Sequence, residues 1–193
     1  MADPTATVAA EFRSIPRDGE THNGDAGFIR VGAVTWLSVI DGLGHGEKAA
    51  EASGRAIEAL EREAVGTQEI GIVMAAVDVA LAGSRGAGAL LCRVGPHAIE
   101  VCSVGNVALR SHPWSVGVLL TAGILGRQVR GFRILTAPYE GSGRLMLFSD
   151  GIRRSATLDE VAGMALGEAC DAIVAKHRDI NDDSTVLIAS INP

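Results

Sequence analysis

Apolar residues recur along the chain with two different periods, which predict strands and helices. Apolar and β-branched residues fill 26–31 and 33–40, which predicts two antiparallel strands joined at Gly32. From 47 to 64, and again from 70 to 81, apolar residues recur every three or four positions, the spacing of a helix with one buried face. The chain is therefore predicted to begin with a strand pair followed by a helix pair.

A second block of strands is predicted after these helices. Turn residues such as Gly, Pro and Asn separate apolar runs at 87–94, 98–104, 107–110, 132–136 and 144–148. Short helices are expected at 158–166 and 168–177, divided at Gly167, and a final strand at 185–191. Strands and helices come in blocks and do not alternate, so the predicted class is α+β, with two stacked, mostly antiparallel sheets and the helices outside.

Composition limits the size and kind of protein. The 193 residues are 47% hydrophobic and 21% charged, enough apolar material for a sizeable core and too much for a disordered chain. We expect a single domain over 1–193, with 1–20 as an N-terminal tail or edge strand and no separate sensory domain. We also expect a monomer.

Charge and cysteine usage exclude several classes of function. The 17 Lys and Arg are scattered among 23 Asp and Glu, so no nucleic acid partner is expected. The longest nearly apolar run, 116–125, is too short to cross a bilayer, and the N-terminus lacks a secretory signal, so no membrane association is expected. Cys92, Cys102 and Cys170 form no CxxC pair and are read as small buried hydrophobes in a reducing, cytoplasmic setting.

Acidic residues stand where predicted strands begin or end. Asp41 and Asp150 directly follow apolar strands, while Asp25 and the pair Asp182–Asp183 precede them. Carboxylates brought together would repel one another unless a cation neutralised them, and oxygen ligands favour Mg²⁺ or Mn²⁺ over Zn²⁺. From spacing alone, each Asp could equally cap or turn its own segment.

Six motifs in order favour a shared cation site over separate caps and turns. Asp25 is followed by DGLGHG (41–46), RGAGALL (85–91), CSVGNV (102–107), FSDGI (148–152) and DDST (182–185). In order and approximate spacing these resemble the metal-dependent protein phosphatase 2C superfamily, most closely its SpoIIE-type branch and the small RsbX-type stressosome phosphatases. The resemblance covers about residues 20–190. It implies a four-layer α-β-β-α sandwich that hydrolyses phosphoserine or phosphothreonine on a protein.

The resemblance also implies two divalent cations, Mn²⁺ or Mg²⁺, at one end of the sandwich. Asp41 would bridge both ions, and Gly42 would offer its backbone carbonyl to one of them. Asp150 and Asp182 would hold the first ion, and Asp25 would serve the second directly or through water. A water shared by the ions would attack phosphorus in line.

Other positions match the family less closely. Asp183 corresponds to a less constant ligand position. His45 could protonate the departing Ser or Thr oxygen, but eukaryotic relatives place their histidine directly after the Asp-Gly pair, where this chain has Leu43. Neither Arg13 nor Arg17 securely matches the phosphate-binding arginine of those relatives.

The expected substrate is a phosphorylated STAS-domain protein such as a stressosome component. Two alternatives stay open: RsbU- or SpoIIE-like action on an anti-anti-sigma factor, and a catalytically inactive domain that only binds a phosphoprotein. The Gly-rich stretch 112–131, with Trp114 and Arg127, is predicted to contact the partner as a flap, or else to be an ordinary strand and turn.

Overall fold

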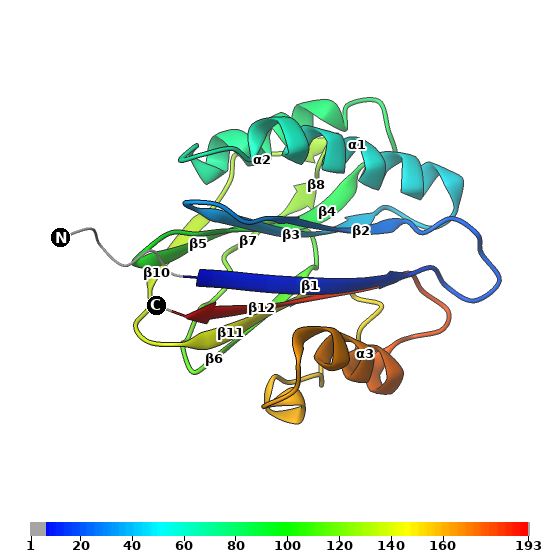
Figure 1. Cartoon of the computed structure of the whole chain (residues 1–193). Helices are drawn as coiled ribbons and strands as arrows, with labels where there is room; N and C mark the ends of the chain where they lie inside the picture. The colour runs from blue at the N-terminus through cyan, green and yellow to red at the C-terminus, as the bar shows by residue number, and fades with distance from the viewer. Residues whose placement is uncertain (1–6, 193) are drawn as a thin grey trace.

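Two β-sheets form the centre of the molecule (Figure 1). The computed structural model describes residues 7–192. The larger sheet consists of β2 (Asp25–Arg30), β3 (Thr35–Gly42), β4 (Ala87–Val94), β5 (Ala98–Val104), β7 (Leu120–Thr121) and β10 (Ile134–Pro138). The smaller sheet consists of β1 (Thr7–Ile15), β6 (Ala108–His112), β11 (Gly143–Phe148) and β12 (Ser184–Asn192). Their strand orders are β10-β5-β4-β3-β2 and β1-β12-β11-β6, all antiparallel except the pairing of β7 with β5.

Helices cover both outer faces of this pair of sheets. α1 (Glu47–Glu63) and α2 (Ile70–Ala80) pack on the larger sheet, and α3 (Leu166–His177) packs on β1 and β12 of the smaller one. The four layers confirm the predicted α-β-β-α sandwich. No helix within residues 7–192 is long and apolar enough to cross a membrane.

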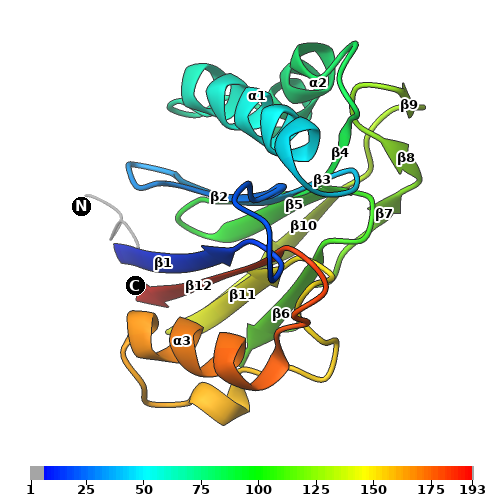
Figure 2. The ribbon, with the colours of Figure 1, turned by 90° about the vertical axis from the view of Figure 1, so that its right-hand side faces the viewer.

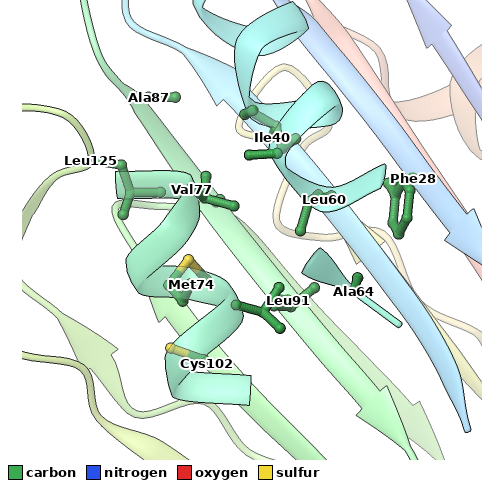
Figure 3. Packing of buried hydrophobic residues seen from close by; sticks show 14 of the residues in the cluster. Phe28, Ile40, Leu60, Ala64, Met74, Val77, Ala87, Leu91, Cys102 and Leu125 are labelled. Carbon is green, nitrogen blue, oxygen red and sulfur yellow. The ribbon is translucent and has the colours of Figure 1, made fainter. Parts of the chain in front are cut away.

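Burial on both faces explains why the central strands read as nearly continuous apolar runs. In β3, Trp36 and Ile40 face the helices, whereas Leu37 and Val39 face the other sheet. Figure 3 shows the helix-facing layer, in which Met74 lies near Leu91 and Cys102. Cys92, Cys102 and Cys170 are all free and buried, as predicted.

The structure decides between the two expectations for the N-terminal segment and corrects one predicted helix. Thr7–Ile15 forms β1, an edge strand paired along its whole length with β12, although its local pattern is weak because several of its side chains are exposed. The helix predicted at 158–166 is wrong: only a 3₁₀ turn, Asp159–Val161, forms there. Gly167 does not divide two helices but lies inside α3, where a Cβ would come within 2.8 Å of Glu11 Oε2 on β1.

Part of the predicted flap region, 123–129, forms a hairpin that packs on α2. β8 (Gly123–Ile124) and β9 (Gln128–Val129) form a small hairpin beside the larger sheet (Figure 2). Leu125 in its turn is buried against α2, near Val77 in Figure 3. The backbone N–H of Gly126 donates to Asp78 Oδ1 at 2.6 Å, which ties the hairpin to α2.

Candidate active site

Strand pairing brings the predicted acidic residues to one end of the sandwich. In the larger sheet Asp25, at the start of β2, is the direct cross-strand partner of Asp41 near the end of β3. In the smaller sheet Asp150 follows β11, and Asp182 precedes β12, the neighbour of β11. Because all these strands are antiparallel, ends and beginnings meet at the same edge.

Three of these carboxylates open into one pocket. Asp41, Asp150 and Asp182 line it together with four glycines and a few further residues. The remaining lining residues are Leu43, Gly44, His45, Gly88, Gly105, Asn106, Gly123 and Ile124. The glycines leave a wide mouth over the acids, so a group the size of a phosphoryl group can reach them.

Asp25 lies behind the pocket and links the two sheets. Its side chain is buried and accepts a hydrogen bond from Ser149 Oγ at 2.5 Å. Ser149 Oγ in turn accepts the backbone N–H of Thr185 at 2.9 Å. The sequence prediction missed Ser149, although it stands inside the FSDGI motif.

Crowding raises the pKa of these acids. Burial, followed by the negative charges of Asp25, Asp150 and Asp182, raises the pKa of Asp41 to about 8. Burial also raises the pKa of Asp25 to about 7, against the stabilising hydrogen bond from Ser149. The pKa of Asp182 rises for the same two reasons, burial and the neighbouring Asp150.

The donor set suits hard divalent cations. The pocket offers three carboxylates and no thiolate, and the pKa values raised by burial and by the neighbouring negative charges mark a place where a bound cation would stabilise the ionised carboxylates. Within residues 7–192, no three His, Cys, Asp or Glu side chains already form a group that could hold a metal ion. The chemistry therefore fits Mg²⁺ or Mn²⁺, and the side chains would have to draw together around the ion.

Asn106 is the second residue that sequence reasoning missed. Its Nδ2 donates to Asp150 Oδ2 at 2.6 Å, and its carbonyl accepts a hydrogen bond from Arg154. It stands in the CSVGNV motif, where the sequence suggested only a tight turn. The structure adds a role for its side chain, which orients Asp150.

Asp183 is placed differently from the other acids. It is buried, and its two carboxylate oxygens accept the backbone N–H groups of Arg17 and Gly24, each at 2.9 Å. These bonds hold the segment that leads into β2, so Asp183 supports the position of Asp25. It does not line the pocket.

Gly42 occupies a position where only glycine fits. A Cβ there would lie 2.5 Å from the carbonyl oxygen of Ala49 and 2.7 Å from that of Gly24. Its own N–H donates to the Gly24 carbonyl at 3.0 Å. Gly42 therefore joins β3, α1 and the segment before β2 at the floor of the site.

His45 lies on the rim of the pocket. Its Nδ1 is 3.1 Å from Glu20 Oε1, which also pairs with Arg17 at 3.3 Å. Arg13 lies elsewhere, bound to Asp171 on α3 at 2.6 Å. A different guanidinium, that of Arg85, lies beside the lining residues Gly44 and His45 and donates to the His45 carbonyl at 3.4 Å.

The structure separates the two residues predicted to contact a partner. Trp114 packs on Tyr139, with ring centroids 5.1 Å apart, and against Gly143 at the start of β11, the end opposite Asp150. The expectation that Trp114 belongs to a flap beside the site is wrong. Arg127, in the β8–β9 hairpin, is exposed and close to Gly86.

The fold is similar to that of several solved proteins. No family model and no curated protein matches the sequence. A chain from a structure of the bacterial stressosome, described as a modular system adapted to control secondary messenger signalling, is 29% identical, with 95% of this chain and 99% of that chain covered and a TM-score of 0.88.

Two further similar structures contain divalent metal ions. RsbX in complex with magnesium is 22% identical, with 96% of each chain covered and a TM-score of 0.85. The catalytic domain of the serine/threonine phosphatase PstP, with two manganese ions, is 16% identical, with 98% of this chain and all of that chain covered and a TM-score of 0.76. The chain thus has the fold of the PP2C-type serine/threonine phosphatases.

Proposed function

We propose that the protein is a metal-dependent protein phosphatase that hydrolyses phosphoserine or phosphothreonine. The observation that carries the proposal is the meeting of Asp25, Asp41, Asp150 and Asp182 at one end of a PP2C-type sandwich, three of them in an open pocket. In a domain that only bound phosphoproteins, this cluster of negative charge would repel the phosphoryl group. In a hydrolytic site, the same carboxylates would bind the cations that the reaction needs.

Four carboxylates and one backbone carbonyl of this chain would hold the cations. Asp41 would bridge them, with Asp150 and Asp182 on one side and Asp25 on the other, and the Gly42 carbonyl would complete the set. When bound, two divalent cations supply the positive charge that binds phosphoryl oxygens and acidifies water. Asn106 and Ser149 orient two of the ligands, which is the usual role of residues behind a metal site.

We assign to His45 the protonation of the leaving Ser or Thr oxygen. It lines the pocket, and its Nδ1 is 3.1 Å from Glu20 Oε1, so Glu20 can fix the orientation of the imidazole. The guanidinium of Arg85, which lies beside Gly44 and His45, would bind oxygens of the incoming phosphoryl group.

We further propose RsbX-like action on a phosphorylated STAS-domain protein in the cytoplasm. Support comes from the likeness to chains from a stressosome structure and from RsbX, which extend over nearly the whole of this chain. The three free, buried cysteines suit a reducing compartment.

The test is phosphate release from a phosphorylated STAS-domain protein and from p-nitrophenyl phosphate by the purified chain and by Asp41→Asn. We expect the wild-type chain with Mn²⁺ to hydrolyse both compounds and Asp41→Asn to lose at least about 99% of the rate. No hydrolysis of either compound by the wild-type chain with Mn²⁺ or Mg²⁺ would contradict the proposal. Hydrolysis of p-nitrophenyl phosphate alone would contradict only the STAS-domain substrate.

A further inference from the structure

Acidic and basic residues are unevenly distributed beside the site. The chain has a net charge of −6, yet no Asp or Glu occurs between Glu100 and Glu140. The same stretch contains four arginines, and three of them, Arg127, Arg130 and Arg133, lie within seven residues of one another. The scattered basic charge expected from the composition therefore does not describe this face of the molecule.

These three arginines are exposed and have no acidic partner. In the part of the chain that the structure describes, none of their side chains forms an ion pair or a hydrogen bond, whereas Arg13, Arg17, Arg55, Arg93 and Arg178 each pair with a carboxylate. One of these guanidinium groups lies in the turn of the β8–β9 hairpin and two lie in the segment between β9 and β10, and like charges this near in sequence repel one another. An acidic partner would relieve that repulsion.

A groove runs between two of these arginines, Arg130 and Arg133, and β7. One wall is formed by Leu120–Gly123 and the other by Gln128 and Arg130–Arg133, and we call it the flap groove. The backbone N–H of Arg133 donates to Thr121 Oγ1 at 3.0 Å, which fixes one wall to the other. Leu120 is 56% exposed and adds an apolar surface to the basic one.

The flap groove adjoins the acidic pocket. Gly123 lines both, so a chain lying in the groove leads directly to Asp41, Asp150 and Asp182. A negatively charged phosphoprotein is repelled by the overall charge of −6, and a basic groove beside the acidic pocket offsets that repulsion at the site of binding.

We propose that the flap groove binds an acidic segment of the phosphoprotein, with Arg130 and Arg133 on its carboxylates and Leu120 against an apolar side chain within it. The proposal rests on the proposed function for the phosphate chemistry, but the groove itself can be tested without that chemistry.

The experiment measures fluorescence anisotropy of a labelled, unphosphorylated peptide rich in Asp and Glu with a central Leu, titrated with the full chain in chelator. A matched peptide carries Asn and Gln in place of the acids. The variants are Arg130→Glu/Arg133→Glu, the neutral Arg130→Gln/Arg133→Gln, and Arg62→Glu, a control on α1 that changes the net charge by as much as the Gln pair does. Circular dichroism checks that each is folded.

We expect the acidic peptide to bind the wild-type chain at least about tenfold more tightly than the neutral one, and to weaken as salt is raised. Arg130→Glu/Arg133→Glu should abolish that preference, the Gln pair should reduce it, and Arg62→Glu should keep it. Equal binding of the two peptides, an unchanged preference in the folded Glu variant, or tighter binding of a single-stranded oligonucleotide than of the acidic peptide would overturn the proposal. Hydrolysis of p-nitrophenyl phosphate by the wild-type chain reports the proposed function separately.

Discussion

At the scale of single residues, the site is a set of carboxylates held close together against their mutual repulsion. Asp25 and Asp41 are cross-strand partners, and burial raises the pKa of both. The sequence identified them because each stands at the end or start of an apolar strand. It could not separate Asp183 from Asp182, because hydrogen bonds to the distant backbone of Arg17 and Gly24 distinguish them.

The first prediction concerns Asp41→Asn without divalent cations. The folded-state pKa of Asp41, about 8, lies above the ordinary value of 3.8, so its contribution to stability is present below about pH 4 and is lost as pH rises through 8. Asn resembles the protonated carboxyl and does not titrate. Thermal unfolding should show a Tm about 5 °C higher for Asp41→Asn than for the wild-type chain at pH 9, with the difference shrinking toward pH 4.

One control variant makes this outcome specific. Asp171→Asn removes an exposed carboxyl that pairs with Arg13 and should not raise the Tm at pH 9. An identical pH dependence of Tm in Asp41→Asn and the wild-type chain would show that Asp41 is not held among like charges.

The second prediction concerns Asn106, which donates to Asp150 Oδ2. Asn106→Ala should weaken Mn²⁺ binding about tenfold, the usual cost of losing a residue that orients a ligand. Isothermal titration with Mn²⁺ measures it. Asn181→Ala, whose side chain bonds only to Asp179, is the matched control and should keep the wild-type affinity. If Asn106→Ala bound Mn²⁺ as tightly as the wild-type chain, Asn106 would not orient Asp150 for metal binding.

At the scale of elements, the strands and helices that bury a face were predictable, and those fixed by distant pairing were not. β3, β4 and α1 show clear periods because their neighbours bury them. For β1, the sequence alone predicts either a tail or an edge strand, because only the pairing with β12, far along the chain, determines its structure. The predicted helix at 158–166 failed because Gly163, at φ +78°, turns the chain before α3 begins.

The third prediction tests the junction of β3 with α1. Gly42→Ala places a methyl group 2.5 Å from the Ala49 carbonyl and should lower the free energy of unfolding by about 1–3 kcal/mol. Gly54→Ala, inside α1 with open space around it, should raise that free energy by about 0.5–1 kcal/mol. Urea denaturation measures both. A Gly42→Ala variant as stable as the wild-type chain would show that the close packing described here is absent.

At the scale of the whole molecule, the two stacked sheets bring the ends of four strands, β2, β3, β11 and β12, to one edge, where Asp25, Asp41, Asp150 and Asp182 lie. The order of motifs along the chain indicated this fold, and the α-β-β-α layers confirm it. The charge distribution over the surface could not be predicted from composition. Arginines that look scattered among 23 acids when only their number is counted include three, Arg127, Arg130 and Arg133, that lie close together in a stretch of sequence without Asp or Glu.

The central claim is that hydrolysis depends on divalent cations bound by Asp41 and its neighbours. The most direct test is a titration of the wild-type chain with Mn²⁺ that follows metal binding by calorimetry and phosphate release from p-nitrophenyl phosphate in parallel samples. The rate of phosphate release should rise as Mn²⁺ binds, and both the rate and the binding should saturate near two ions per chain. In excess chelator the rate should fall to background. Full hydrolysis in chelator, or Mn²⁺ binding with no rise in phosphate release, would contradict the claim.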